Sequence, residues 1–332
     1  MKNQLRNQII KNERKTYMKI VVTPRGFAKC GLNNVKIIKD AGFIVEYNDT
    51  GIAYTKEEFY EKTLDADGLI VGVELIDKEY IDSHTNLKVI VKFGVGTDNI
   101  DVEYCRQKGI FVGRTVGSNS RSVAETAISF IFADSKNLYE SIQNVRECKW
   151  TKQTGYEIEN KVIGIVGFGS IGKMVAKMAL GLGMKVLVYD PYIIDEEFIK
   201  KCDVEVVPFK EILKRSDFIS LHIPLTKETS NFITLTQLKE MKPSAVLINT
   251  ARGGIVNEED LYIALSESLI RAAYFDVFSK EPPKSDEPLL KLSNFYLTPH
   301  IASRSKEAEK NTADMSTKII IEALKSYNKG EI

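Results

Sequence analysis

The stretch Val166-Gly-Phe-Gly-Ser-Ile-Gly172 decides the fold of this chain. An apolar run at 161–166 leads into these glycines, and a helical run at 173–182 follows them. Glycines at this spacing let a strand turn tightly into a helix, and they let a pyrophosphate approach backbone N–H groups at the helix N-terminus. The stretch therefore predicts a strand–turn–helix unit that binds a dinucleotide.

The next apolar run indicates which dinucleotide is bound. It covers 185–189 and ends at Asp190, eighteen positions after Gly172. An acid at this place accepts hydrogen bonds from the ribose hydroxyls of the adenosine half of the cofactor. A carboxylate also repels the 2′-phosphate of NADP, and the following Pro191 and Tyr192 supply no compensating cation. The pattern therefore favours NAD over NADP.

Short apolar runs rich in Val and Ile recur along the chain with helical patterns between them. Such runs are typical of parallel strands that are buried on both faces. The first series lies at 20–22, 43–47, 69–71, 89–91 and 110–112. The second series lies at 161–166, 185–189, 218–221, 245–249, 272–275 and 295–297. We therefore expect an α/β protein with two doubly wound parallel-sheet domains.

Two helix starts can be predicted from capping residues. Thr55 and Glu58 have the spacing of a capping box, in which a hydroxyl and a carboxylate satisfy free N–H groups at the helix start. Ser122 and Glu125 have the same spacing within a long helix that we expect at 118–134. Both pairs therefore predict capped helices.

Composition excludes several classes of protein. The chain has 332 residues, of which 43% are hydrophobic and 27% charged, as is usual for a globular protein of two domains. Its 46 Lys and Arg against 45 Asp and Glu give a formal net charge of +1, so no global field attracts nucleic acid or anionic lipid. No apolar run approaches the roughly 18 residues that span a bilayer. We expect neither nucleic acid nor a membrane as a partner.

The chain has three histidines and four widely separated cysteines, Cys30, Cys105, Cys148 and Cys202, without a CxxC pair. This usage is typical of reduced thiols in a cytoplasmic protein, and we expect no metal site. Residues 1–17 are rich in Asn, Gln, Lys and Arg and lack the apolar core of a secretory signal. We therefore expect a disordered extension there.

Three loops that follow strands carry side chains of different chemistry: Arg252, Glu281 and His300. Because the carboxyl ends of parallel strands line one crevice, these side chains can converge beside a nicotinamide ring. A guanidinium suits a carboxylate, and an imidazole exchanges a proton near neutral pH. A carboxylate bonded to that imidazole orients it and favours its protonated form. The three loops therefore predict a site for proton and hydride transfer on an organic acid.

Taken together, these motifs resemble the NAD-dependent D-2-hydroxyacid dehydrogenases, and most closely the short D-3-phosphoglycerate dehydrogenases. The resemblance covers about residues 18–330 and includes Gly94-Val-Gly-Thr-Asp-Asn-Ile-Asp101. It implies a catalytic triad of Arg252, Glu281 and His300. It implies substrate contacts from Lys92, Val95 and Gly96 as well as Arg252, where the N–H groups of Val95 and Gly96 would hold the carboxylate. It implies NAD contacts from Gly167, Gly169, Ser170, Ile171, Gly172, Asp190, Ile223, Thr250 and Asp276.

The resemblance also implies the domain organisation. A flavodoxin-like substrate-binding domain would be discontinuous, comprising residues 18–117 plus 302–332. A Rossmann NAD-binding domain, residues 118–301, would be inserted between these parts, with the active site in the cleft. Long helices at 118–134 and in the amphipathic tail at 305–327 would connect the two domains. The chain would form a homodimer through the NAD domain.

The expected reaction is reversible hydride transfer between a D-2-hydroxy acid and its 2-oxo acid. His300 would take the hydroxyl proton, Glu281 would hold the imidazole, and Arg252 would bind the carboxylate and polarise the carbonyl oxygen. The resemblance implies 3-phosphoglycerate as the substrate, and thus a place in serine biosynthesis.

Two departures from that family leave alternatives open. The loop Val71-Gly-Val-Glu-Leu75 lacks the arginine that helps to hold the substrate phosphate, and Lys92 stands where a second arginine is usual. A reductase of hydroxypyruvate, glyoxylate or another 2-oxo acid is therefore the first alternative. A non-catalytic NAD-sensing protein, as in certain transcriptional corepressors, is a more distant one. Only 32 residues follow His300, so we expect no additional regulatory domain.

Overall fold

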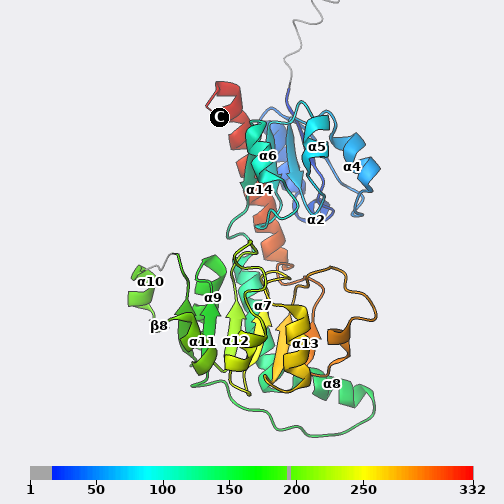
Figure 1. Ribbon diagram of the computed structural model, residues 1–332. Helices are drawn as coiled ribbons and strands as arrows, with labels where there is room; N and C mark the ends of the chain where they lie inside the picture. Colours follow the sequence, from blue (N-terminus) through cyan, green and yellow to red (C-terminus); the bar gives the residue numbers. More distant parts are fainter. Residues whose placement is uncertain (1–16, 193–195, 332) are drawn as a thin grey trace, which may run out of the picture. The chain divides into compact units, whose positions relative to one another are not determined.

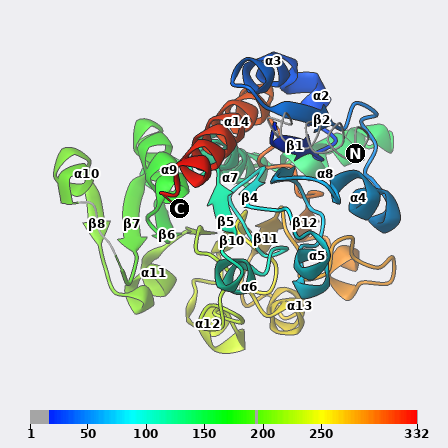
Figure 2. The ribbon, with the colours of Figure 1, turned by 90° about the horizontal axis from the view of Figure 1, so that it is seen from above.

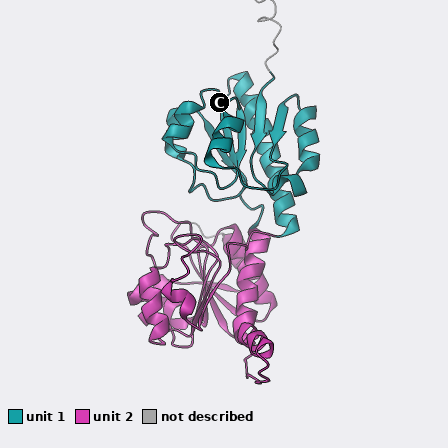
Figure 3. Ribbon diagram, turned by 90° about the vertical axis from the view of Figure 1, so that its right-hand side faces the viewer, with its two compact units in different colours: residues 1–119, 305–332 teal, residues 120–304 magenta. Residues whose placement is uncertain are grey.

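The computed structural model describes residues 17–192 and 196–331. Except for Tyr17, the predicted N-terminal extension lies outside the described residues. The chain divides into two compact units, coloured separately in Figure 3. Unit 1 comprises the residues up to 119 and those from 305 onward, and unit 2 comprises residues 120–304. The boundaries expected from the sequence, after 117 and 301, lie a few residues earlier in the chain.

Unit 1 is built on a five-stranded parallel sheet with the order β2-β1-β3-β4-β5. Its strands are β1 (Lys19–Val22), β2 (Ile44–Tyr47), β3 (Gly68–Val71), β4 (Val89–Lys92) and β5 (Phe111–Arg114). Its helices are α2 (Phe27–Cys30), α3 (Leu32–Asp40), α4 (Lys56–Thr63), α5 (Lys78–Ser83), α6 (Val102–Gln107) and α14 (Lys306–Lys329), shown in Figure 1. This strand order is flavodoxin-like, as predicted.

Both faces of the unit 1 sheet are buried because successive side chains of a strand point to opposite faces. Val22 packs in the cluster that includes Ile38 of α3 and Leu324 of α14. Its neighbour Val21 packs in the other cluster, together with Phe59 of α4 and residues of α5 and α6. The strand ends that carry the loops of interest are therefore fixed by packing from both sides.

Unit 2 is built on a seven-stranded parallel sheet with the order β12-β11-β10-β9-β6-β7-β8. Its strands are β6 (Val162–Val166), β7 (Lys185–Tyr189), β8 (Val204–Val206), β9 (Phe218–Leu221), β10 (Val246–Asn249), β11 (Ala272–Phe275) and β12 (Phe295–Leu297). Figure 2 shows β6, β7 and β8 side by side. The order runs outward from β6 in both directions, which is the predicted Rossmann arrangement.

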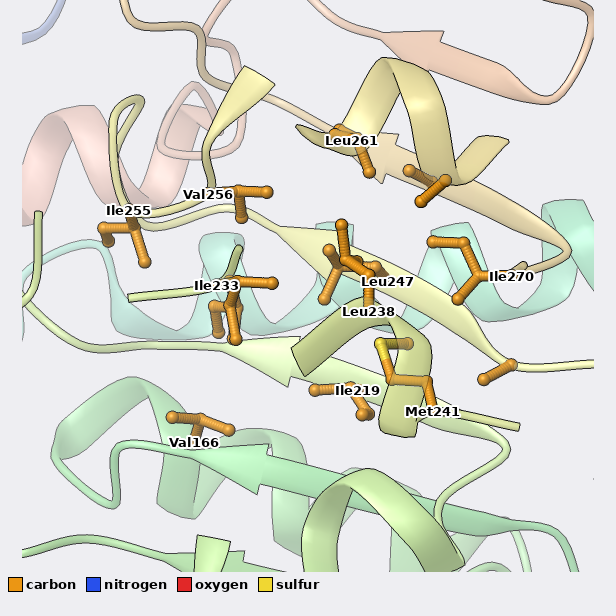
Figure 4. Close-up of a cluster of buried hydrophobic side chains, with 14 of the residues drawn as sticks. Val166, Ile219, Ile233, Leu238, Met241, Leu247, Ile255, Val256, Leu261 and Ile270 are labelled. Carbon is orange, nitrogen blue, oxygen red and sulfur yellow. The ribbon is translucent and has the colours of Figure 1, made fainter. Parts of the chain in front are cut away.

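Helices cover both faces of the unit 2 sheet. They are α7 (Ser120–Ser135), α8 (Leu138–Arg146), α9 (Ser170–Gly181), α10 (Glu196–Lys201), α11 (Phe209–Arg215), α12 (Leu235–Glu240), α13 (Glu258–Ser266) and the 3-10 helix η1 (Pro288–Lys291). On the face of α11–α13, Ile219 and Leu247 of neighbouring strands pack with Leu238, Met241 and Leu261 (Figure 4). On the other face, α7 and α9 pack in a second apolar cluster. The carboxyl ends of β6, β9, β10 and β11 are thereby held in a rigid core.

Two helix starts are capped by side chains, one of them as predicted. Thr55 accepts a hydrogen bond from the N–H of Glu58, and the Glu58 carboxylate accepts one from the N–H of Thr55. The predicted capping box is therefore confirmed. The C-terminal helix begins at Lys306, where the Ser305 hydroxyl accepts from the N–H of Ala308 at 3.1 Å.

The capping box predicted at Ser122 and Glu125 is wrong. Helix α7 already begins at Ser120, so Ser122 lies in its first turn instead of preceding it. The Ser122 hydroxyl donates to the backbone oxygen of Ala302 at 2.6 Å, and Glu125 pairs with Arg121 at 2.8 Å. The serine thus ties α7 to the loop after β12 instead of capping the helix.

Strand β8 and helix α8 were not predicted from the sequence. β8 is a three-residue edge strand with two exposed residues, and α8 buries none of its side chains. Elements that bury so little leave no apolar pattern of the kind that marks the central strands.

All four cysteines lie within the described residues and are free thiols. Within residues 17–192 and 196–331, no three His, Cys, Asp or Glu side chains are grouped so that they could hold a metal ion. None of the helices in this part of the chain is both long enough and apolar enough to cross a bilayer.

Candidate active site

The glycine stretch forms a tight turn at the point where the strand order of unit 2 reverses. Gly167 follows β6 and has a φ of +96°, a conformation that favours glycine. A Cβ atom on Gly167 would lie 2.7 Å from the backbone carbon and oxygen of His222, which follows β9. A Cβ atom on Gly172 would lie 2.1 Å from the oxygen of Gly167, so α9 is seated directly on the turn. Ligands of open α/β sheets bind at such reversal points.

The residues at the start of α9 fit a pyrophosphate. Gly169 is the N-cap of this helix, and no side chain caps it. A Cβ atom on Gly169 would meet no atom within 4 Å. A ligand in the space in front of the helix can therefore approach the backbone directly. The first N–H groups of α9, beginning at Ser170 and Ile171, therefore combine with the helix dipole to attract an anion.

Asp190 lies directly after β7 and is fixed beside the glycine turn. Its Oδ2 accepts from the N–H of Phe168 at 2.7 Å, and its Oδ1 accepts from the N–H of Tyr192 at 3.0 Å. A carboxylate oxygen can accept more than one hydrogen bond, so acceptors remain for the hydroxyls of a ribose. The arrangement fits the adenosine half of NAD.

Thr250 and Ile223 border the same edge of the sheet. Thr250 follows β10 and is buried, and its hydroxyl has no hydrogen-bond partner among the described residues. An unsatisfied buried hydroxyl costs about 1–3 kcal/mol, so a bound group that satisfies it is favoured. The Cγ2 atom of Ile223 lies 2.9 Å from the place of a Cβ atom on Gly167, which puts Ile223 against the turn. Both positions agree with contacts to a cofactor.

Asp276 shapes the loop that carries His300. Its Oδ1 accepts from the Thr298 hydroxyl and from the N–H of Ile301, and its Oδ2 accepts from the N–H of Ala302 at 2.7 Å. The backbone oxygen of Asp276 also accepts from the N–H of His300 at 2.9 Å. The side chain therefore has a positioning role that the sequence did not indicate, while its expected NAD contact stays a prediction.

His300 and Glu281 form a hydrogen-bonded pair. The Nδ1 atom of His300 lies 2.8 Å from Oε2 of Glu281, and the other carboxylate oxygen accepts from the N–H of Phe278 at 3.0 Å. Because an ionised carboxylate only accepts, Nδ1 carries the proton and Nε2 is left to exchange one. The imidazole is 46% exposed, and His300 has a φ of +53°, which is uncommon outside glycine and typical of functional loops.

The other two histidines are unsuited to proton exchange. His84 is buried in unit 1, and burial lowers its pKa. The Nδ1 atom of His222 is buried without a hydrogen-bond partner among the described residues, and burial lowers the pKa of His222 to about 3. His300 is therefore the one described histidine that combines an accessible imidazole with a carboxylate partner.

The turn after β10 presents Arg252. The buried side chain of Asn249 donates to the oxygen of Arg252 at 2.8 Å and accepts from the N–H of Ala251 at 3.0 Å. The Nη1 atom of Arg252 donates to the oxygen of Ala251 at 2.7 Å. Asn249 thus holds the backbone of this turn in place, a role that its position at the end of a buried strand could have indicated.

Gly253 brings the turn of Arg252 against the loop of Glu281. A Cβ atom on Gly253 would lie 2.1 Å from the carbon and oxygen of Phe278 and 2.3 Å from the nitrogen of Ser279. No side chain fits there, so the two backbones touch. The sequence pointed to Arg252 but not to this role of the glycine that follows it.

The loop after β4 lies in unit 1 and has the donors expected for a carboxylate. The N–H and the hydroxyl of Thr115 both donate to the oxygen of Gly94 at 2.9 Å, which anchors the loop. Within residues 17–192 and 196–331, the N–H groups of Val95 and Gly96 donate to no protein acceptor. Two adjacent N–H groups without partners suit an anion.

Lys92, at the end of β4, is bonded to the loop after β3. Its Nζ donates to the oxygen of Gly72 and to Oδ1 of Asn99, the latter at 2.6 Å. In the same loop, the Glu74 carboxylate accepts from the N–H of Gly72 at 2.8 Å. Beside Lys92, this loop therefore contains an acidic side chain, and residues 71–75 include no Lys or Arg.

Comparison with known proteins agrees with this geometry. The family described as "D-isomer specific 2-hydroxyacid dehydrogenase, NAD binding domain" matches residues 128–302. A glyoxylate reductase of Korarchaeum cryptofilum is 40% identical over 84% of this chain and 84% of its own length. A D-3-phosphoglycerate dehydrogenase of Methanocaldococcus jannaschii is 39% identical over 90% of this chain, which spans 56% of that protein.

Solved structures lead to the same family. A D-lactate dehydrogenase of Aquifex aeolicus, complexed with NAD and lactic acid, superposes with a TM-score of 0.78 at 27% identity. The match covers 94% of this chain and 96% of that one. The strand orders, the glycine turn and these relatives agree, and the chain belongs to the NAD-dependent D-isomer specific 2-hydroxyacid dehydrogenases.

Proposed function

We propose that this dehydrogenase interconverts a short, unphosphorylated 2-oxo acid, such as glyoxylate or hydroxypyruvate, and the corresponding D-2-hydroxy acid. The observation that carries the catalytic part is the 2.8 Å contact between His300 and Glu281. It orients an exposed imidazole and stabilises the positive charge that this imidazole gains during the reaction.

The residues divide the reaction between them. When the hydroxy acid is oxidised, Nε2 of His300 takes the hydroxyl proton, and in reduction it returns the proton to the carbonyl oxygen. Bound beside this site, NAD would supply the acceptor for the C2 hydride in oxidation, and NADH the donor in reduction. The Arg252 guanidinium binds the carboxylate and polarises the carbonyl oxygen. In unit 1, the N–H groups of Val95 and Gly96 bind the substrate carboxylate.

The loop after β3 favours an unphosphorylated substrate. A phosphate carries close to two negative charges and needs charge-assisted hydrogen bonds. Glu74 adds a negative charge to this loop, and Lys92 already donates to Gly72 and Asn99. The similarity to a glyoxylate reductase over most of both chains supports the same substrate class.

3-Phosphoglycerate is the second candidate. It is favoured by the similarity to a D-3-phosphoglycerate dehydrogenase and by Lys92, a cation one strand away from the loop that lacks the arginine. A lysine ammonium can bind a phosphate as a point charge.

A screen of NADH oxidation tests the proposal. The purified enzyme is compared on glyoxylate, hydroxypyruvate, phosphohydroxypyruvate, pyruvate and 2-oxoglutarate. We expect kcat/KM to be highest for an unphosphorylated acid, and Lys92→Ala to change KM for hydroxypyruvate and phosphohydroxypyruvate alike. A preference for phosphohydroxypyruvate, lost about tenfold or more in Lys92→Ala, would establish the second candidate instead, since a charged hydrogen bond contributes roughly 1.5–3 kcal/mol.

We also propose that the chain forms a homodimer through unit 2. Helix α8 buries no side chain, and its apolar residues Leu138, Ile142 and Val145 recur at helical spacing with exposed fractions of 43%, 51% and 55%. Trp150, just beyond this helix, is 81% exposed. An apolar surface of this kind is typical of one that another subunit covers. Sedimentation analysis should find a dimer that Ile142→Glu converts to a monomer, and a monomeric wild type would refute the proposal.

A further inference from the structure

We propose that Glu258 is a positioning residue for hydride transfer, which holds the loop of Glu281 through Ser279 and thereby keeps Glu281 aligned with His300. The inference rests on the proposed acid–base role of His300 and Glu281, and it does not depend on which 2-oxo acid is reduced.

The contact between Glu258 and Ser279 uses both carboxylate oxygens. Glu258 is the first residue of α13, and its Oε1 accepts from the N–H of Ser279 at 2.7 Å. Its Oε2 accepts from the Ser279 hydroxyl at 2.5 Å. Two bonds from one carboxylate to one residue fix the orientation of that residue as well as its distance.

Hydrogen bonds and peptide bonds connect this contact to the imidazole. Ser279 is adjacent to Phe278, whose N–H donates to Oε1 of Glu281. The other oxygen of Glu281 contacts Nδ1 of His300. Loss of the Glu258 contact therefore frees Ser279 and the adjacent Phe278, whose N–H holds the Glu281 carboxylate.

The loop is held from two directions. Gly253 packs against the backbone of Phe278 and Ser279 so closely that no Cβ atom fits between them. This contact stops the loop from moving toward the turn of Arg252, and the Glu258 carboxylate stops Ser279 from moving away from α13. Catalytic groups need placement to within a fraction of an ångström, so such a restraint has kinetic consequences.

Glu258 is a half-buried carboxylate among further acidic groups. Burial raises its pKa, nearby Glu287 raises it as well, and the two bonds from Ser279 oppose this effect. The N-terminus of α13 also favours a negative charge. Glu259, the next residue of the same helical turn, is exposed. It therefore serves as a matched control for the charge and for the helix dipole.

Four variants separate the grip on Ser279 from other effects. Glu258→Ala removes both acceptors. Glu258→Gln keeps the contact, because its amide oxygen accepts from the N–H of Ser279 and its NH2 group donates to the serine oxygen. Ser279→Ala removes the hydroxyl bond but keeps the bond to the backbone N–H. Glu259→Ala removes an equal charge from the same turn.

The measurements are the pH profile of kcat for NADH-dependent reduction and KM for NADH. We expect Glu258→Ala to lower kcat about tenfold or more. This loss would be part of the roughly 10²–10⁴-fold that acid–base catalysis contributes in total. The alkaline limb of its profile should move to lower pH, because a misaligned Glu281 stabilises the imidazolium less. KM for NADH should stay unchanged. Ser279→Ala should give a smaller shift, and Glu258→Gln and Glu259→Ala should match the wild type.

Glu281→Ala, measured in parallel, distinguishes the two ways of failing. If its pH profile equals that of the wild type, the proposed acid–base pair is wrong, and the inference is wrong with it. If the pH profile of Glu281→Ala moves but that of Glu258→Ala does not, Glu258 has only a structural role. This conclusion holds even if Glu258→Ala lowers the melting temperature. An equal shift in Glu259→Ala would assign the effect to charge and overturn the inference. Should Glu258→Ala fail to fold, Ser279→Ala decides, and an unmoved profile would refute the role of the contact.

Discussion

His300 is the residue on which the proposed chemistry depends most. His300→Ala should lower kcat by about 2–4 orders of magnitude, because a positioned acid–base group contributes roughly that much. NADH binding, followed by its fluorescence, should remain near that of the wild type, since the glycine turn is built from other loops. A variant with wild-type kcat would remove His300 from its assigned role.

We expect the carboxylate of Asp190 to set the choice between NAD and NADP. Asp190→Ala should weaken NAD binding and relax discrimination against NADP, because it removes both a ribose acceptor and the repulsion of the 2′-phosphate. It also frees the N–H groups of Phe168 and Tyr192 that the carboxylate holds. KM values for NADH and NADPH provide the test, and a wild type that prefers NADPH would contradict the assignment.

For individual residues, the sequence indicated the chemical role of a side chain better than it indicated its hydrogen-bond partners. The resemblance pointed to Glu281 and His300, which the structure brings into contact. It could not show that the Asp276 carboxylate is bonded to the loop of residues 298–302, because such contacts depend on how two strand ends meet. For the same reason, the sequence did not point to the contact between Glu258 and Ser279.

Helix α9 offers a matched pair of glycines. Gly169→Ala should leave stability nearly unchanged, because its Cβ atom meets no protein atom, but it should weaken NAD binding by filling the space in front of the helix. Gly172→Ala should destabilise the fold by about 1–3 kcal/mol, as overpacking does, because its Cβ atom would lie 2.1 Å from the oxygen of Gly167. Thermal melts with and without NADH measure both effects. Equal loss of stability in the two variants would contradict this account.

His84, directly after helix α5, should make the stability of unit 1 depend on pH. His84 is buried, stacks on Tyr80 with 3.8 Å between ring centroids, and contacts Thr63 through Nε2 at 3.0 Å. Burial lowers its pKa, so the unfolded chain binds a proton more readily than the folded one. Neutral His84 therefore contributes fully to the free energy of unfolding above about pH 6.5. This contribution is lost as the pH falls toward the lowered pKa, at a rate of at most about 1.4 kcal/mol per pH unit.

Urea titrations at pH 7.5 and 5.5 test this dependence. The free energy of unfolding should fall between the two pH values in the wild type. His84→Gln, which does not titrate, should lose part of the dependence, and His222, whose Nδ1 atom is buried, should account for some of the remainder. If the free energy of unfolding of His84→Gln depended on pH in the same way as that of the wild type does, His84 would have the same pKa in the folded and unfolded states, contrary to this prediction.

At the level of elements, burial decided what the sequence could predict. The central strands were found because Val and Ile fill both faces, as at Ile90 and Val91 of β4. β8 and α8 were missed because they bury little. The capping pattern at Ser122 failed because the same four residues also fit inside a helix, and only the packing of α7 shows where the helix begins.

For the whole molecule, the division into two units predicts an independent NAD-binding fragment. Unit 2 is continuous in sequence and has apolar clusters on both faces of its own sheet. Residues 120–304, expressed alone, should unfold cooperatively and bind NADH with an affinity close to that of the full chain. A fragment without a cooperative transition would show that unit 2 needs the rest of the chain to fold.

The discontinuity of unit 1 has a consequence for biosynthesis. Helix α14 covers β3, β4 and β5, yet the ribosome makes it only after all of unit 2. At about 5–20 residues per second, the nascent sheet therefore waits on the order of ten seconds for the helix that completes it. During that interval the apolar face of β4 is open to chaperones and proteases. A message truncated before α14 would release a finished NAD-binding unit attached to a bare, aggregation-prone sheet.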